Sequence, residues 1–433
     1  MTYQEAVARV LALRGGEHAG MRAGLERVEG LLAALGHPEE RYTLVQVGGT
    51  NGKGSVASML AGMLKAAGRR VGLYTSPHLC SFRERIRVNA EPIAPDAVAD
   101  GVDALGTLIA RFDASMFEAT TAIALDHFAR EAVDVAVLEV GLGGRLDATT
   151  VGHPAVTVLS RIDLDHQKYL GDTLAAIAGE KAAIIRSGLA LSAAQAPDAM
   201  DVILRRAREA GVPLSVEGRE LAVTVEAKSL DGQRISCTGP DWALRDLELP
   251  LLGAFQPANA LLAVAAAAAL GVDEGAIRAG LARAHWPGRL DIVRRDPYLV
   301  LDGAHNPAGA RALARSLPEL FGEAPLTLVL GLSEDKDAGA ILGALAPLAT
   351  RLVLTRASNP RAADPRTLAA ALPAKSPPPE IADSAAEALR IAMGPGQTPI
   401  VGVAGSLFLL GDVFTLLAGE PDKPCPIEKG ADI

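Results

Sequence analysis

The glycine-rich stretch at residues 45–55, Val-Gln-Val-Gly-Gly-Thr-Asn-Gly-Lys-Gly-Ser, constrains the fold of this chain more than any other segment. An apolar run ends in a turn that holds glycines, Lys53 and Ser55, and a helical pattern follows at residues 56–67. Glycines let several backbone N–H groups point at one anion, the helix N-terminus adds partial positive charge, and the lysine adds a full charge. This order of strand, loop and helix predicts a site for the phosphates of a nucleoside triphosphate.

The loop departs from the strict phosphate-loop pattern at two positions. That pattern has glycine where this chain has Val47, and serine or threonine where it has Gly54. The hydroxyl group comes one residue later, on Ser55. An ordinary glycine-rich turn is the alternative, but the lysine and the hydroxyl both stand where a phosphate needs them. The predicted triphosphate-binding residues are Gly49, Thr50, Asn51, Gly52, Lys53, Gly54 and Ser55.

The composition restricts the class of protein. A net charge of −9 at pH 7 argues against a nucleic-acid binder, which usually has a basic balance. The three cysteines, Cys80, Cys237 and Cys425, have no metal-ligand spacing and indicate no disulfide framework. The N-terminus lacks the apolar core of a secretory signal, and the longest apolar run, residues 260–270, is too short to span a bilayer. We expect a cytoplasmic protein that binds neither nucleic acid nor membrane.

Apolar runs alternate with helical patterns over the first half of the chain. Four runs are rich in valine and leucine with little alternation, as is usual for parallel strands covered on both faces. They are residues 44–47, 71–74, 133–140 and 155–160. Helical spacing between them predicts a doubly wound α/β sheet. Residues 218–252 instead hold short alternating segments separated by turn dipeptides, which predict a small appended antiparallel sheet.

A second α/β unit is predicted after the Trp-Pro-Gly-Arg sequence at residues 286–289. The rhythm of strand and helix restarts there, beginning with an apolar run at residues 298–301. We therefore divide the chain into a domain of residues 1–287 and a smaller, Rossmann-like C-terminal domain of residues 288–433. Residues 376–380, Ser-Pro-Pro-Pro-Glu, are predicted to form a loop, and the polar tail after Gly419 is expected to be loosely held.

A carboxylate ends one of the predicted strands. Glu139 closes the apolar run that begins at Val135, and phosphate-loop proteins often place an acid there to hold Mg²⁺ directly or through water. The alternative is a glutamate that only caps the next turn. The following Gly-Leu-Gly-Gly-Arg-Leu at residues 141–146 has Leu146 in place of the third glycine of a dinucleotide-binding fingerprint, which argues against a nicotinamide site.

Further polar groups follow other predicted strands. Asp165 and His166 come after the run at residues 155–160, and ligands of open α/β sheets bind at the carboxyl ends of the strands. Asp302 and His305 hold the same position in the second unit, where the next residue, Asn306, is a suitable helix N-cap. We expect these side chains at a site. Lys181, inside a predicted helix, is expected from the residues alone to be a solvated surface lysine.

Seven motifs follow one another over about residues 20–415. They are Gly49-Thr-Asn-Gly-Lys-Gly-Ser55, Tyr74-Thr-Ser-Pro-His-Leu79, Glu139-Val-Gly-Leu-Gly-Gly-Arg-Leu-Asp-Ala148, Glu180-Lys-Ala182, Trp286-Pro-Gly-Arg289, Asp302-Gly-Ala-His-Asn306 and Gly331-Leu-Ser-Glu-Asp-Lys-Asp337. Together they resemble the folylpolyglutamate synthase/dihydrofolate synthase family, a branch of the Mur ligases. The resemblance implies a phosphate-loop ATPase domain of the Mur ligase type with the small antiparallel sheet, joined to the Rossmann-like α/β domain.

The resemblance also implies a reaction. ATP phosphorylates the carboxylate of a pterin-linked substrate, and the amine of L-glutamate attacks the acyl phosphate to form an amide. Dihydropteroate and tetrahydrofolate are the expected acceptors, and Mg²⁺, as two ions, and K⁺ are the expected metal cofactors. A monofunctional folylpolyglutamate synthase is the alternative, and a nucleotide-dependent switch is a further one, although the Asn-Lys-x-Asp motif of a GTPase is absent from the sequence. A monomer is expected.

Residue roles carried over from the resemblance fall into three groups. Lys53 offsets triphosphate charge, and the other expected ATP contacts outside the loop are Asn259, Arg289, Asp302 and His305. The expected metal ligands are Ser76, Glu139, His166 and, if CO₂ carbamylates it, Lys181. The expected pterin-binding residues are Ser115, Met116, Phe117, Glu118, Leu146, Asp147 and Ala148. Because ATP contacts come from both domains, the resemblance predicts that the domains close during the cycle.

Overall fold

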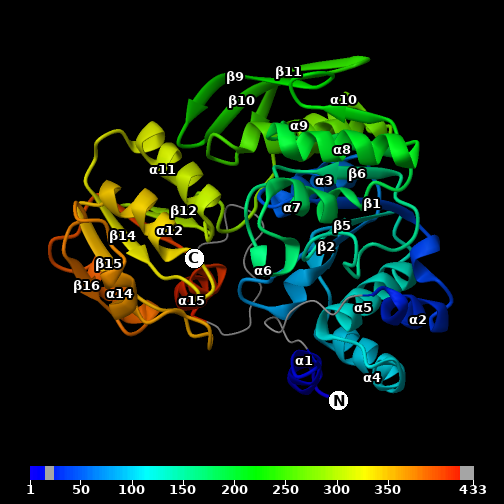
Figure 1. Ribbon diagram of the computed structural model, residues 1–433, viewed down its shortest axis with the longest axis horizontal. Coiled ribbons are helices and arrows are strands. Elements are labelled where there is room, and N and C mark those ends of the chain that lie inside the picture. Colours follow the sequence, from blue (N-terminus) through cyan, green and yellow to red (C-terminus); the bar gives the residue numbers. More distant parts are fainter. Residues whose placement is uncertain (15–23, 420–433) are drawn as a thin grey trace.

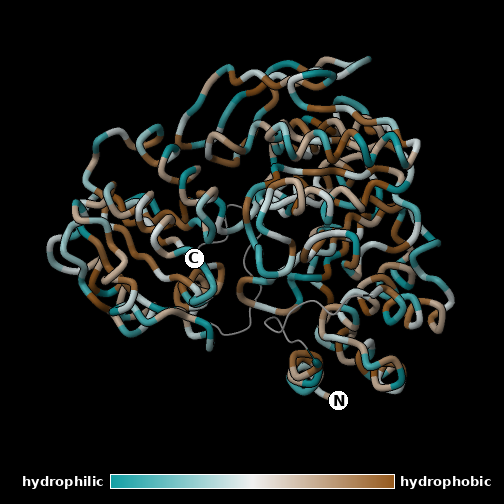
Figure 2. The backbone as a smooth tube through the Cα atoms, in the orientation of Figure 1, coloured by the Kyte–Doolittle hydropathy of each residue, from teal (hydrophilic) through white to brown (hydrophobic). Residues whose placement is uncertain are grey.

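The computed structural model describes residues 1–14 and 24–419. These residues form two α/β units that lie side by side, with a small antiparallel sheet above the larger unit (Figure 1). The predicted loose tail after Gly419 lies outside the described residues. Apolar segments gather inside both units and polar ones outside (Figure 2). In the described part of the chain, no helix has the length and apolar character needed to cross a membrane.

The larger unit is built on an eight-stranded sheet in the order β4-β3-β2-β5-β1-β6-β7-β8. Its strands are β1 Thr43–Gly48, β2 Val71–Tyr74, β3 Ile86–Val88, β4 Glu91–Pro92, β5 Val135–Glu139, β6 Val156–Leu159, β7 Leu189–Ser192 and β8 Leu214–Val216. All neighbours are parallel except around β3 and β4, which form an antiparallel edge. The four strands predicted in this half of the chain are confirmed, and β1 lies between β5 and β6.

Helices cover both faces of this sheet. One apolar cluster joins β1 to α3 (Lys53–Ala66), α9 (Gln256–Ala269) and α10 (Glu274–Leu281). The opposite face packs on α1 (Tyr3–Leu11), α2 (Glu26–Ala34), α4 (Pro95–Phe112) and α5 (Met116–Arg130). A third cluster, at the β7 and β8 end, holds α7 (Leu174–Ala182) and α8 (Pro197–Ala210), with the short α6 (Gln167–Leu170) next to them. Burial on both faces explains why the strand sequences show little alternation.

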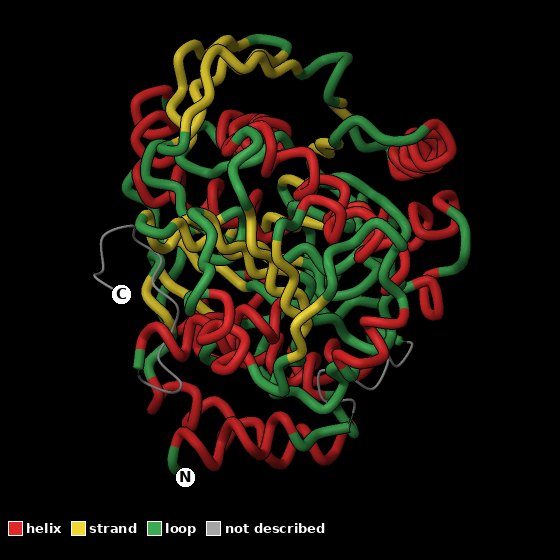
Figure 3. Tube along the Cα trace, turned by 90° about the vertical axis from the view of Figure 1, so that its left-hand side faces the viewer, coloured by secondary structure: helices red, strands yellow, loops and turns green. Residues whose placement is uncertain are grey.

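The predicted small sheet is present and antiparallel. Strands β9 (Ala222–Ser229), β10 (Gly232–Gly239) and β11 (Trp242–Leu249) form a meander with β10 in the centre. Alternate residues of β10, among them Ile235 and Cys237, join the apolar cluster of α3 and α9. The meander stands at the end of the molecule opposite the N-terminal helix (Figure 3).

The C-terminal unit has a six-stranded sheet in the order β12-β13-β17-β14-β15-β16. Its strands are β12 Asp291–Arg295, β13 Tyr298–Asp302, β14 Leu326–Leu330, β15 Arg351–Leu354, β16 Pro379–Ile381 and β17 Ile400–Ala404. Its helices are α11 Pro307–Phe321, α12 Ala338–Leu345, α13 Pro365–Ala370, α14 Ala385–Ala392 and α15 Leu407–Ala418. Only β12 runs antiparallel to its neighbour, so the predicted Rossmann-like α/β arrangement is confirmed.

One predicted loop is partly wrong. Residues 376–380 were expected to be loop throughout, but β16 begins at Pro379 and pairs with β15. The strand is the edge of the sheet, where a proline loses no ladder hydrogen bond on its outer side. Three consecutive prolines therefore do not exclude a short edge strand.

Candidate active site

The phosphate loop joins β1 to α3 at the carboxyl edge of the larger sheet. Helix α3 begins at Lys53, and its N-cap Gly52 has a φ of 96°, a left-handed conformation that favours glycine. A Cβ at Gly52 would come within 2.3 Å of Asn259 Oδ1, on α9. Backbone conformation and close packing therefore both require this glycine, and they bring the predicted ATP contact Asn259 against the loop.

Packing also explains why the loop departs from the strict pattern. A Cβ at Gly54 would lie 2.8 Å from Trp286 Nε1, so the serine or threonine of that pattern does not fit there. The hydroxyl of Ser55, which is buried, instead accepts a hydrogen bond from Gln256 Nε2 at 3.3 Å. Gln256 also holds Asn259, whose Nδ2 donates to Gln256 Oε1 at 3.0 Å. Gln256 was not among the residues expected at the site, although it stands three residues before Asn259 on the same helix.

Lys53, at the start of α3, and Glu139, at the end of β5, interact electrostatically. Lys53 Nζ donates to the backbone oxygen of Thr50 at 3.2 Å. Glu139 ends β5 beside β1, is buried, and accepts a hydrogen bond from the backbone N–H of Ser76 at 3.2 Å. Burial raises the pKa of the Glu139 carboxyl, and the positive charge of Lys53 opposes this shift. The arrangement places an acidic group beside the loop, as predicted from the strand end.

Lys181 is not the solvated surface lysine that the residues alone predicted. Its side chain is buried, and Nζ donates to the backbone oxygen of Gly49, in the phosphate loop, at 2.8 Å. Burial, together with the charge of Lys53, lowers its pKa from 10.5 to about 7. The prediction failed because a short helix does not show by its sequence which face lies against the loop. A substantial fraction of Lys181 is a neutral amine near neutral pH.

Asp165 brings together side chains from both units. Its Oδ2 accepts a hydrogen bond from Asn306 Nδ2 at 3.0 Å, and its Oδ1 accepts one from Lys336 Nζ at 3.0 Å. His305 Nε2 lies 3.9 Å from Oδ2. Burial favours a higher pKa for Asp165, but His166, Lys336 and His305, all cationic at the low pH where this carboxyl titrates, outweigh burial and hold the pKa below its ordinary value. The carboxylate is therefore ionised.

His166 has a left-handed backbone, with a φ of 50°, immediately before α6. Its backbone N–H donates to Asp165 Oδ1 at 2.8 Å. Burial lowers its pKa to about 4, although the neighbouring Asp165 works against this shift. The imidazole is therefore neutral near pH 7, which is the form that ligates metal ions.

A pair of asparagines connects the two units directly above the loop. Asn51 and Asn306 exchange side-chain amide hydrogen bonds, at 3.0 Å from Asn306 Nδ2 and at 3.3 Å from Asn51 Nδ2. Asn306 is also the N-cap of α11, because its Oδ1 accepts from the backbone N–H of Gly309 at 2.8 Å. The cap was predicted, whereas the contact with the loop was missed, since no local pattern relates residues 255 positions apart.

The remaining predicted ATP contacts lie at the junction of the units. Asp302 is buried at the end of β13, and its two oxygens accept from the backbone N–H groups of Leu290 and Ala304, each at 2.8 Å. Burial lowers the pKa of the Arg289 guanidinium, and the carboxylates of Asp302 and Glu139 oppose this shift. Arg289 thus joins the electrostatic environment of Glu139, although it belongs to the start of the second unit.

The two predicted pterin-binding segments meet at Gly141. Asp147 Oδ2 accepts from the backbone N–H groups of Gly141 at 3.1 Å and of Leu142 at 2.9 Å. Phe117 packs against the same glycine, where a Cβ would come within 2.5 Å of its ring. The ring centroid of Phe117 lies 5.9 Å from that of Tyr74. The structure therefore brings both segments together, one strand away from the phosphate loop.

Some residues of these segments have structural partners. Ser115 and Glu118 form a capping box at the start of α5, with hydrogen bonds of 2.8 and 3.3 Å. Glu118 also accepts from Arg27 Nε at 2.8 Å, in a buried ion pair. Met116 and Ala148 are buried and Leu146 is partly buried. These contacts account for Glu118 without any ligand.

The donors present fit a magnesium ion. Mg²⁺ prefers oxygen ligands and usually takes one or two carboxylates. Among the described residues, Oε2 of Glu139 accepts the hydrogen bond from Ser76, and Oε1 accepts none. The free carboxylate oxygen of Glu139 is a suitable ligand, and Ser76 stands beside it, whereas His166 lies among Asp165, Lys336 and His305. Arg85 is a further buried cation near Glu139, and it was not predicted from the sequence. Burial lowers the pKa of its guanidinium to about 10, and the negative charge of Glu139 opposes this shift.

Two family descriptions match the chain and together cover most of it. The Mur ligase middle domain matches residues 47–267. The Mur ligase glutamate ligase domain matches residues 288–407. The chain belongs to the Mur ligase family. The predicted fold class and the predicted membership of the Mur ligases are thereby confirmed.

Individual relatives lie in the predicted branch of this family. A Mycobacterium tuberculosis protein named dihydrofolate synthase/folylpolyglutamate synthase is 38% identical over 90% of this chain and 85% of its own length. A Halobacterium salinarum protein named probable bifunctional folylpolyglutamate synthase/dihydropteroate synthase is 37% identical over 96% of this chain. The chain spans about half of that relative, 52% of its length.

A solved structure of Escherichia coli FolC in complex with DHPP and ADP is similar over nearly the whole chain. Its TM-score is 0.88 and its identity 32%, over 97% of this chain and 98% of the other. The resemblance to the folylpolyglutamate synthase/dihydrofolate synthase branch, predicted from seven motifs, is therefore confirmed. The roles of single residues stay predictions, because neither the names of the relatives nor their similarity assigns them.

Proposed function

We propose that the chain is an ATP-dependent ligase that joins L-glutamate to the carboxylate of a pterin-linked acceptor through an acyl phosphate. Dihydropteroate, which gives dihydrofolate, and tetrahydrofolate, which gives polyglutamates, are the proposed acceptors. The observation that carries the proposal is the meeting of three groups at one sheet edge: the phosphate loop, the buried Glu139, and the Phe117 and Asp147 segments that join at Gly141. The DHPP and ADP in the similar E. coli structure support the same pair of ligands.

The chain supplies charge and orientation for this reaction. Lys53 and the N-terminus of α3 stabilise triphosphate charge, and Asn259 fixes the loop. From the second unit, Asn306 contacts Asn51 of the loop, and His305 lies near Asp165. The charge of Arg289 acts on Glu139. Because both units contribute contacts, closing them around the ligands excludes water that would hydrolyse an acyl phosphate. The proposed domains, residues 1–287 and 288–433, follow this division.

Metal binding is proposed at Ser76, Glu139 and His166. When bound, Mg²⁺ supplies positive charge against phosphate oxygens. The names of the relatives and of the solved structure mention no potassium ion, so K⁺ stays a prediction of the family resemblance. The proposed monomer and the cytoplasmic location also rest on the sequence alone.

Carbamylation is proposed at Lys181. The Nζ lone pair of its neutral amine adds to the carbon of CO₂, and a proton leaves to solvent, so that an anionic carbamate replaces a potential cation. A pKa of about 7 makes the required neutral amine abundant near neutral pH. The carbamate oxygens would then lie beside Gly49, where an anion can serve a metal ion.

The deciding experiment measures ADP release with Mg-ATP and glutamate, comparing dihydropteroate with tetrahydrofolate as acceptor. Turnover that requires glutamate with both acceptors is the expected result. Turnover with tetrahydrofolate alone would favour the second candidate, a monofunctional folylpolyglutamate synthase like the relatives that carry only that name. ADP release that neither acceptor stimulates would contradict the proposed function.

A further inference from the structure

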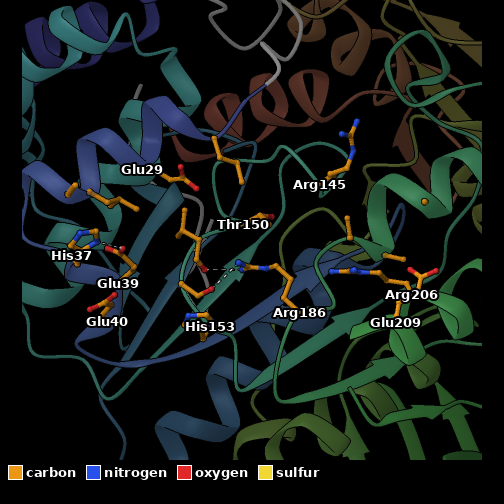
Figure 4. A pocket seen from close by; sticks show the side chains of 18 of the residues that line it. Glu29, His37, Glu39, Glu40, Arg145, Thr150, His153, Arg186, Arg206 and Glu209 are labelled. Atoms are coloured by element: carbon orange, nitrogen blue, oxygen red, sulfur yellow. Dashed lines mark hydrogen bonds and ion pairs between the residues drawn. The ribbon is translucent and has the colours of Figure 1, made fainter. Parts of the chain in front are cut away.

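The cavity behind α7 belongs to the larger unit alone (Figure 4). Its volume is about 830 Å³, and the described residues that line it all fall within residues 25–209. Ala182 and Ala183 of α7 line it, whereas Lys181 of the same helix donates to the phosphate loop. The second unit instead reaches the phosphate loop at the junction of the units, around Asp165.

Lys336 comes to this junction from the motif at residues 331–337. The motif follows β14, so it lies at the carboxyl edge of the C-terminal sheet. The backbone N–H of Lys336 donates to the backbone oxygen of Ser333 at 3.1 Å. The next residue, Asp337, is the N-cap of α12, and its side chain accepts from the backbone N–H of Ala340 at 2.9 Å. The backbone is therefore fixed on both sides of Lys336.

The Lys336 side chain crosses from the second unit to the larger one. Its Nζ donates to Asp165 Oδ1 at 3.0 Å, and the two side chains are 13% and 9% exposed. Asp335 Oδ2 lies farther from Nζ, at 3.8 Å, and is exposed. His166 and His305 also lie near Asp165, but burial lowers the pKa of both imidazoles, which are therefore mainly neutral near pH 7. Of these three neighbours, Lys336 is then the one that meets the carboxylate as a cation.

Asp165 connects Lys336 to the phosphate loop through Asn306. Its other oxygen, Oδ2, accepts from Asn306 Nδ2 at 3.0 Å, and Asn306 exchanges amide hydrogen bonds with Asn51 of the loop. The contacts from Lys336 to Asp165, from Asp165 to Asn306 and from Asn306 to Asn51 each cross the junction of the units. A carboxylate that accepts on both oxygens has a fixed orientation, so the lysine helps to set where the asparagine pair stands.

A second ion pair joins the units at the other end of α11 from Asn306. Lys228 Nζ, on β9, donates to Glu319 Oε2, on α11, at 3.0 Å, but these side chains are 43% and 47% exposed. Exposed pairs contribute little because water screens them, whereas a buried carboxylate that loses its cation is strongly unfavourable. The two pairs have equal lengths, but only the buried pair at Asp165 is expected to hold the units together.

We propose that Lys336 is a positioning residue that holds the second unit on the phosphate loop in the arrangement that forms ADP. Its ammonium group neutralises Asp165, and Asp165 orients Asn306 against Asn51. In this role Lys336 does not contact ATP, so its loss weakens the orientation of the second unit and leaves ATP binding to the loop. The effect on turnover rests on the proposed function, whereas the contact between the units does not depend on it.

Steady-state ADP release by the whole protein tests this role, with Mg-ATP, glutamate and, in separate assays, dihydropteroate or tetrahydrofolate. Lys336→Met should lower kcat by about tenfold to a hundredfold, because a hydrogen bond to a charged group is lost. The KM for ATP should change by less than about threefold, because the loop still binds ATP. Lys336→Arg keeps a cation and should recover most of the kcat.

Lys228→Met is the matched control, since it removes the exposed pair of the same length. It should turn over like the parent protein. An unchanged kcat in Lys336→Met, a loss confined to the KM for ATP, or an equal loss in Lys228→Met would overturn the proposal.

A double variant shows whether Lys336 acts through Asp165. If it does, adding Lys336→Met to Asp165→Asn should lower kcat no further, because the lysine has already lost its charged partner. Losses that multiply would mean that the ammonium acts on a ligand directly, and they would overturn the positioning role. The double variant also removes the buried carboxylate that Lys336→Met leaves without its cation, so this comparison stays available if Lys336→Met alone is too unstable to assay.

Small-angle X-ray scattering keeps the positioning role and the proposed function distinguishable, because it requires no turnover. The radius of gyration of Lys336→Met should exceed that of the parent protein, and that of Lys228→Met should equal it. Coincident profiles for Lys336→Met and the parent protein would overturn the positioning role, even in a protein with pterin-stimulated ADP release. A larger radius in a protein without such ADP release would support the contact between the units and contradict the ligase.

Discussion

The two α/β units use the same local arrangement, a parallel strand followed by a loop and a helix, for opposite purposes. In the larger unit, β1 leads into a loop of glycines and Lys53, which prepares the N-terminus of α3 for an anion. In the smaller unit, β13 leads to Asp302 and His305, and Asn306 closes the N-terminus of α11 with its own side chain. The comparison teaches that capping decides the role of a helix N-terminus. The uncapped N-terminus of α3 is open to a ligand, whereas the capped N-terminus of α11 holds Asn306 against the phosphate loop.

The largest expected effect comes from the open loop. Lys53→Ala should reduce pterin-stimulated ADP release by about 10²–10³-fold, because a charge aimed at the reacting phosphates is lost. Lys65→Ala, at the other end of α3 and exposed, should leave the rate near that of the parent protein. If both variants turn over alike, the loop takes no part in the reaction and the comparison fails.

The second effect concerns the lysine behind that loop. Lys181→Ala should lose most of its activity, and added short carboxylic acids should restore part of it by replacing the proposed carbamate. The rate of ADP release with and without acetate measures this. Lys65→Ala with acetate is the control for a general salt effect. Full activity of the plain Lys181→Ala variant would reduce Lys181 to a packing residue of α7.

The third test separates the two roles of the capped end. Asn306→Ser keeps an N-cap side chain, so the free energy of unfolding should fall only by the loss of the contacts with Asn51 and Asp165, about 1–3 kcal/mol. The shorter side chain no longer reaches Asn51 or Asp165, and we expect about tenfold lower turnover, equal to about 1.4 kcal/mol, from the lost contacts between units. Equal turnover with equal stability would show that the cap is the sole role of Asn306.

The smallest effect tests the packing of the loop. Gly54→Thr restores the strict pattern but places a Cβ against the ring of Trp286, and should destabilise the protein by about 1–3 kcal/mol. Thermal unfolding measures the loss, and a second change, Trp286→Ala, should make room for the threonine. If the threonine destabilises the Trp286→Ala variant as much as it destabilises the parent protein, the strain lies elsewhere.

Local patterns in the sequence predicted the fold and one part of the site. Burial on both faces of the parallel strands leaves valine-rich runs, and the glycine–lysine loop follows one of them, so the sheet and the loop were readable. The Asn51–Asn306 pair was not, because it joins segments that only the tertiary fold brings together. The prediction for Lys181 was wrong for a related reason. Its helix is only nine residues long, and its partner, the backbone oxygen of Gly49, is distant in the sequence.

Asp147 and Glu118 show that a motif can also suggest ligand contacts for residues that have structural partners. The family resemblance places both in pterin-binding segments, yet the structure gives each a set of backbone or side-chain partners that explains it without a ligand. Residues that build a loop and residues that touch a ligand look the same in a motif. Only the substitution of one side chain while the backbone is kept distinguishes them.

The contact between Gly54 and Trp286 has a consequence for building chimeric enzymes. Trp286 stands just before the proposed boundary at residue 287, and its ring is seated on the first turn of α3. A cut at residue 287 therefore keeps the ring with the loop it packs against, whereas a graft that carries Trp286 along would need a core whose loop has glycine at the position of Gly54. The fusion boundary for such work therefore lies after Trp286.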